Sequence, residues 1–86
     1  MTEKKPSVKI SVIPNPTDGY FSVNFDGTID FMEIYSLLGN RIYSSNGLEL
    51  SQKIIDISEM PAGIYIISIK SGNDFFYHKL LRQKSL

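Results

Sequence analysis

Hydrophobic and polar residues alternate along most of the chain, in short runs that turn residues interrupt about every 8–12 positions. Alternation with a period of two is typical of β-strands that bury one face. No segment has the spacing of an amphipathic helix. The pattern therefore predicts an all-β protein, an Ig-like antiparallel β-sandwich of about seven strands.

The run that begins at Gly63 is apolar on both faces, which is typical of a central strand. For the last predicted strand, residues 75–82, the pattern leaves two registers open. Either Phe76, Leu80 and His78 face the core, or the opposite set of side chains does. The predicted strands span residues 8–13, 20–25, 31–36, 41–45, 50–57, 63–70 and 75–82.

Inward positions of these strands define a predicted hydrophobic core. In the strand at 31–36, for example, Met32 and Ile34 share one face, while Glu33 lies on the other. The predicted core side chains are Phe21, Val23, Phe25, Met32, Ile34, Ile55, Ile57, Tyr65, Ile67 and Ile69.

Glycines mark two turns where the backbone needs special freedom. Gly39 is the natural left-handed position of the turn after Leu37 and Leu38, and these leucines are predicted to cap one end of the sandwich. Gly63 follows Pro61 at the entry to the central strand, where we expect a positive φ or a close backbone approach.

Composition supports one small β-domain. Twelve Ile, five Phe and five Tyr stand against one Ala in 86 residues, and such side chains suit a pleated surface. A chain of this length forms one core. We expect residues 1–7 to be a linker or a remnant that begins with an added start methionine, and residues 8–86 to form the domain. Residues 1–7 lack the apolar segment of a signal peptide.

The formal net charge is zero, but basic residues gather near both ends. Residues 10–78 hold three Lys or Arg residues against eight carboxylates, which argues against a nucleic-acid surface. The longest run without a charge or a turn, residues 63–69, is far shorter than the ~20 residues of a membrane-spanning helix. The chain is therefore predicted to bind no nucleic acid and not to span a membrane.

Candidate catalytic chemistry is sparse. There is no Cys, and the one His, His78, lies within a predicted strand with no nucleophile motif nearby. The five tyrosines could form a platform for sugars, but routine surface tyrosines of a small β-domain are the favoured interpretation. We therefore predict no enzyme, no metal and no cofactor. Turn hydrogen bonding is favoured over calcium binding for the loop carboxylates Asp18, Asp26, Asp30 and Asp74.

Three motifs occur together and in a fixed order. The first is Pro14-Asn15-Pro16, followed by a turn with Gly19 and an alternating strand. The second, residues 34–42, is a strand with Tyr35 and a turn at Gly39. The third is Pro61-Ala62-Gly63-Ile64-Tyr65, leading into the central strand. The chain then finishes on a basic and apolar segment, Lys79-Leu80-Leu81-Arg82-Gln83-Lys84.

Together these motifs resemble the C-terminal sorting domains, type A, of the type IX (Por) secretion system of Bacteroidetes, over about residues 10–84. One departure is Met60, where the family usually has Leu. Either Arg82 or Lys84 corresponds to the family's terminal basic residue. The residues that carry the resemblance are Pro14, Asn15, Pro16, Gly19, Gly39, Pro61, Gly63, Tyr65, Lys79, Arg82 and Lys84.

The resemblance implies a secretion signal. It would direct an N-terminally attached cargo from the periplasm across the outer membrane, to the cell surface or the medium. The implied partners are the type IX translocon and a sortase-like signal peptidase, which would cut ahead of the first strand, within residues 1–7 or upstream.

The C-terminal residues raise a separate question. We expect residues 83–86 to add little to the core, so a deletion of residues 82–86 would spare the fold and block export. The alternative is that the tail completes an edge strand, and then the deletion lowers stability and export together.

A second function stays open from the sequence. An Ig-like accessory module that binds carbohydrate or protein ligands would have the same fold. Its signs would be a cluster of exposed aromatics on one face or a shared set of loop carboxylates.

Overall fold

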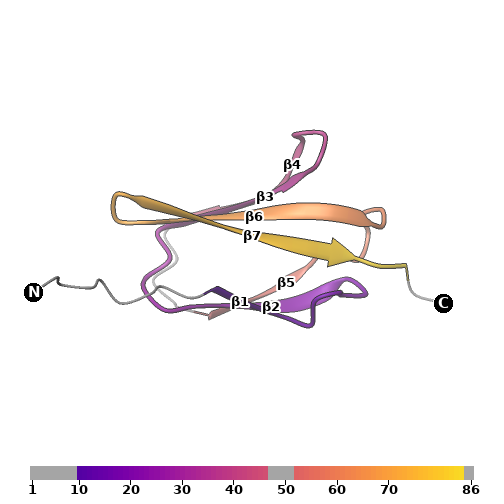
Figure 1. Cartoon of the computed structure of the whole chain (residues 1–86), viewed down its shortest axis with the longest axis horizontal. Coiled ribbons are helices and arrows are strands. Elements are labelled where there is room, and N and C mark those ends of the chain that lie inside the picture. The colour runs from indigo at the N-terminus through magenta and orange to yellow at the C-terminus, as the bar shows by residue number, and fades with distance from the viewer. Residues whose placement is uncertain (1–9, 47–51, 85–86) are drawn as a thin grey trace, which may run out of the picture.

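A computed structural model describes residues 10–46 and 52–84 of the chain. These residues form seven strands and no helix, so none of them could cross a membrane as a helical span (Figure 1). The strands are β1 (Ile10–Ile13), β2 (Tyr20–Phe25), β3 (Phe31–Ser36), β4 (Arg41–Asn46), β5 (Gln52–Asp56), β6 (Gly63–Ser71) and β7 (Asp74–Arg82).

The strands form two antiparallel sheets that face each other (Figure 1). One sheet has the order β1-β2-β5, and the other has the order β4-β3-β6-β7. This arrangement corresponds to the A-B-E and C′-C-F-G sheets of an Ig-like sandwich. The predicted fold class is confirmed, and β6 is central, between β3 and β7, as its two apolar faces predict.

The core lies between the sheets and contains every predicted core side chain. Register explains this agreement, because Met32, Ile34 and their partners Ile69 and Ile67 on β6 all point inward. The open register of β7 is also settled: Leu80 is buried, Phe76 and His78 are half-buried, and the alternate set is exposed. Additional buried hydrophobic side chains are Val12, Ile29 and Leu80.

The role of two leucines and several strand ends need correction, and three predicted boundaries lie outside the described residues. Leu37 and Leu38 do not cap the sandwich but are exposed to solvent, because the turn between β3 and β4 points away from the opposite sheet (Figure 1). β5 ends at Asp56, one residue earlier than predicted, although Ile57 is buried. β4 and β6 each end one residue later than predicted, and β7 begins one residue earlier. The predicted strand starts at residues 8 and 50, and the domain boundary at residue 8, lie outside the described ranges.

Gly63 has a φ of +154°, which confirms the predicted positive value, although a Cβ there would meet no atom within 4 Å. The constraint is the backbone conformation, which a β-branched residue adopts only with strain of about 1–3 kcal/mol. We expect Gly63→Val to lower the melting temperature by several degrees, about 4–8 °C per kcal/mol for a domain of this size. Ala62→Val, at the exposed neighbouring position, is the control. Equal melting temperatures for the two variants would contradict this role of Gly63.

Candidate functional site

Three segments far apart in the sequence meet at one end of the sandwich. They are residues 14–19, between β1 and β2, residues 57–63, between β5 and β6, and residues 79–83, at the end of β7. We call this end the motif pole, because residues of the first and third sequence motifs and the basic end of the chain lie there. β1 runs toward it, so the chain enters the sandwich from the opposite side (Figure 1).

Asn15 joins the first motif to the last strand. Its side-chain amide donates to the carbonyl of Lys79 at 3.0 Å and accepts from the amide of Leu81, also at 3.0 Å. One side chain therefore satisfies two backbone groups on the edge of β7, as a neighbouring strand would. The prolines on either side, Pro14 and Pro16, follow cis peptide bonds and are exposed.

Thr17 extends this junction, and the sequence motifs did not single it out. Its amide donates to the carbonyl of Leu81 at 2.9 Å, and its carbonyl accepts from the amide of Gln83 at 2.8 Å. The buried Thr17 hydroxyl accepts from the amide of Gly19 at 3.0 Å and donates to the carbonyl of Tyr20 at 2.6 Å. A hydroxyl residue directly before Asp-Gly is a turn signal that could have indicated this role.

Gly19 packs against the third segment. It has a φ of +143°, and a Cβ there would lie 2.7 Å from the Cα of Ser58, so no larger side chain fits. Its carbonyl accepts from the amide of Ile57 at 2.7 Å. Asp56 fixes the same turn, because its carboxylate accepts from the Ser58 amide at 2.8 Å, and its hydrogen bonds with Ser58 lower the pKa of Asp56.

Arg82 connects β7 to the third segment from the inside. Its guanidinium donates to the carbonyls of Ile57 at 3.4 Å and Ser58 at 2.8 Å, and to the carbonyl of Gln83. Only 9% of the residue is exposed. The expectation that the tail is dispensable for the fold is therefore wrong for Arg82, which belongs to β7 and holds the pole together.

The other predicted site residues lie at or near the same end. The buried Tyr65 donates its hydroxyl to the carbonyl of Pro61 at 2.5 Å and so holds the Pro61 loop. Lys79 and Lys84 are exposed, unlike Arg82. Gly39 has a φ of +92° in the turn between β3 and β4, outside the hydrogen-bonded junction.

The pole has a groove of about 360 Å³, lined by Pro14, Pro16, Asp18, Tyr20 and Gln83. The Gln83 side-chain amide donates to the carboxylate of Asp18 at 3.2 Å, so the groove brings the first motif and the C-terminal segment together.

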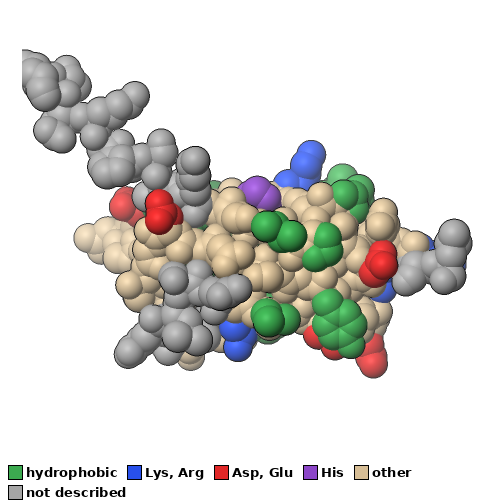
Figure 2. All heavy atoms as spheres, turned by 90° about the horizontal axis from the view of Figure 1, so that it is seen from below, with side chains coloured by type: hydrophobic (Ala, Val, Ile, Leu, Met, Phe, Trp, Pro, Cys, Tyr) green, Lys and Arg blue, Asp and Glu red, His purple; other side chains and the backbone are tan. Residues whose placement is uncertain are grey.

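The outer face of the β1-β2-β5 sheet carries exposed hydrophobic side chains (Figure 2). Those exposed on these three strands are Ile13, Tyr20 and Ile54.

The alternatives to the motif pole are a metal site at the loop carboxylates and a platform of exposed aromatic side chains. The residues that the structure describes include no group of three or more His, Asp or Glu side chains that could hold a metal ion. Asp30 accepts from the amide of Gly72 at 2.7 Å, which is turn chemistry. The exposed tyrosines Tyr20 and Tyr77 lie on different sheets, whereas Phe75 and Tyr77 are both exposed on the same face of β7.

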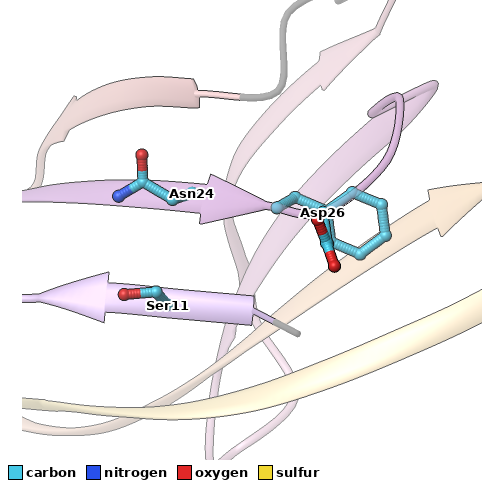
Figure 3. A pocket seen from close by; sticks show the side chains of 4 residues that line it. Ser11, Asn24 and Asp26 are labelled. Carbon is cyan, nitrogen blue, oxygen red and sulfur yellow. The ribbon is translucent and has the colours of Figure 1, made fainter. Parts of the chain in front are cut away.

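A second pocket, of about 260 Å³, lies where β1 begins and β2 ends. Its lining residues are Ser11, Asn24, Phe25 and Asp26 (Figure 3). It is an open recess with one carboxylate, and none of the residues of the sequence motifs lines it. The motif pole is therefore the candidate functional site.

The chain is similar to known proteins over most of its length. The family model described as "Secretion system C-terminal sorting domain" matches residues 11–83. The chain is 30% identical over 73 residues to ulvan lyase NLR42 of Nonlabens ulvanivorans and 32% identical over 74 residues to an endo-acting ulvan lyase of Formosa agariphila. Each match covers 84% of this chain but 14% of the relative, so this chain is similar to a small part of either protein.

Proposed function

The chain belongs to the family of type IX secretion C-terminal sorting domains, and from this premise we propose that the motif pole is the surface by which the translocon recognises it. The domain is a C-terminal signal for export of an attached cargo through the outer membrane, and it is a signal rather than a catalyst. The partners that read the signal and the residues that they contact are the subject of the proposal.

The observation that carries the proposal is the hydrogen-bonded junction of three distant segments at one end of the fold. Asn15, Thr17 and Arg82 bond to backbone groups that lie 24 to 66 residues away in the sequence. Residues of the first and third motifs and the end of β7 therefore belong to one folded junction, and the groove lined by Pro16 and Gln83 lies where the first motif meets the C-terminal segment. β1 runs toward the motif pole, so a cargo that precedes β1 would be attached at the opposite end of the sandwich. The motif pole would then stay accessible to a partner.

A sortase-like signal peptidase is the second partner in this proposal. A cut ahead of β1 would release the cargo and break no strand pairing, whereas a cut within β1 would disrupt its ladder with β2. The cleavage position is therefore proposed within residues 1–7 or upstream. The activity named for the two relatives belongs to much longer proteins, and we assign no such activity to this chain.

The test is a fusion of a fluorescent reporter, with a periplasmic signal peptide, to residues 6–86 in a bacterium that has type IX secretion. We expect the reporter outside the cell or on its surface. The matched control lacks residues 6–86 and should stay in the periplasm. Retention of the fusion in the periplasm, or equal export of the control, would contradict the proposed function.

A further inference from the structure

The turn between β3 and β4 carries two leucines whose side chains are exposed to solvent. Leu37 is 65% exposed and Leu38 is 89% exposed, the largest fraction among the large hydrophobic side chains that the structure describes. Single exposed hydrophobic residues are common, but two adjacent ones at a protruding tip are typical of an interaction site. We call residues 36–40 the leucine turn.

Hydrogen bonds within the leucine turn hold it in one conformation. The amide of Gly39 donates to the carbonyl of Ser36 at 2.9 Å, and the amide of Ser36 donates to the carbonyl of Asn40 at 2.9 Å. The Ser36 hydroxyl also accepts from the amide of Asn40 at 3.2 Å. A turn whose backbone is fixed in this way presents its leucines to a partner at a reduced cost of ordering the backbone.

The base of the hairpin is braced as well. The carboxylate of Glu33 accepts from the hydroxyl of Tyr35 at 2.9 Å and from the guanidinium of Arg41 at 3.0 Å, through different oxygens. The hydrogen bond to Glu33 raises the pKa of Tyr35, so the phenol keeps its proton. The pairing of β3 with β4 shifts register after Ile34, while β3 stays paired with β6 through Ser36, and the turn that follows projects away from the rest of the fold (Figure 1).

Charge around the leucine turn distinguishes a protein partner from a lipid surface. Segments that bind anionic membranes place free Lys or Arg residues beside their hydrophobic side chains. Within residues 36–41 the one cation is Arg41, and it is paired with Glu33 at 3.0 Å. A protruding pair of leucines without free cations fits a concave apolar pocket of a protein.

The leucine turn is continuous with the motif pole. Ser36, its first residue, pairs with Tyr65 on β6, and the Tyr65 hydroxyl holds the carbonyl of Pro61 at the pole. We propose that Leu37 and Leu38 insert into an apolar pocket of the translocon protein that reads the motif pole. This inference rests on the proposed function and adds a second contact to it.

The test replaces both leucines, as Leu37→Ser with Leu38→Ser, in the reporter fusion. We expect the rate of export to fall about tenfold, as for the loss of a central interface contact, with the melting temperature of the domain unchanged. The matched control is Ile54→Ser, at a hydrophobic residue that is 71% exposed on the other sheet, and it should export normally. Leu38→Met, which conserves volume, should also export normally.

Normal export of the double variant would overturn the inference, whereas failure of the unmodified fusion would overturn the proposed function itself. If the double variant melts at a lower temperature, Leu38→Ser alone decides, because that side chain is the more exposed of the two. A last experiment mixes the purified domain with vesicles that contain phosphatidylglycerol. Sedimentation of the purified domain with these vesicles, lost in the double variant, would assign the leucines to a lipid surface instead.

Discussion

Arg82→Ala is expected to lower the stability of the domain and the export of a fused cargo together. The guanidinium donates to the carbonyls of Ile57, Ser58 and Gln83 in a site where the residue is 9% exposed. Removal of the side chain takes the donor away from the carbonyls of Ser58 and Gln83, whereas the Ile57 carbonyl still accepts from the amide of Met60 at 2.9 Å. The cost is about 1–3 kcal/mol for each buried group that stays unpaired. Thermal melting of the purified variant measures the first effect, and the extracellular fraction of the fusion measures the second.

Two further substitutions separate the fold of the pole from its charge. Arg82→Lys keeps the positive charge but replaces the planar guanidinium, which bonds three carbonyls, with a single ammonium group. We therefore expect this variant to have a lower melting temperature as well. Lys84→Ala removes an exposed cation of the same segment and should leave the melting temperature unchanged. If Arg82→Ala melts like the parent but is not exported, a partner reads the charge of Arg82 directly, and the structural role is refuted.

Ile67→Ala is expected to have the largest effect on stability within the core. Ile67 is fully buried in the central strand, between its partners Ile34 on β3 and His78 on β7. Truncation of such a side chain costs about 2–5 kcal/mol, because it removes apolar contacts and leaves a cavity. This is a large part of the roughly 5–15 kcal/mol that stabilises a typical domain. Urea denaturation measures the change.

The control for this substitution is Ile54→Ala, at a side chain that is 71% exposed. Its effect on the free energy of unfolding should stay within about 0.5 kcal/mol. Similar losses for Ile54→Ala and Ile67→Ala would mean that the two sheets do not pack around Ile67 as described.

The strands and the core could be predicted from the sequence because they depend on local order. Alternation places Phe21 and Val23 on one face of β2 whatever the rest of the chain does, and the face with more hydrophobic residues is buried. The positive φ of Gly39 and Gly63 was predictable for the same reason, since glycine accepts the turn that its neighbours require.

Contacts between distant segments could not be predicted in this way. Asn15 reads as a turn residue in the sequence, and only the packing of the two sheets brings it to the edge of β7. Arg82 belongs to a basic segment in the sequence and nothing local predicts its burial, for which neighbouring carbonyls compensate. Leu37 and Leu38 show the opposite error, because hydrophobic character alone does not show whether a turn lies against the core or beyond it.

The junction between Thr17 and Gln83 also requires that nearly the whole domain has been synthesised. Its hydrogen bonds join residues near the start of the domain to the last described strand, across almost the whole chain. Contacts of such long sequence separation form late in folding, after the cost of closing the loop has been met. A chain that stops before residue 79 cannot make any of them, however well its other strands pair. Because the carbonyl of Thr17 accepts from the amide of Gln83, the complete set of these hydrogen bonds forms only in a chain that extends through Gln83.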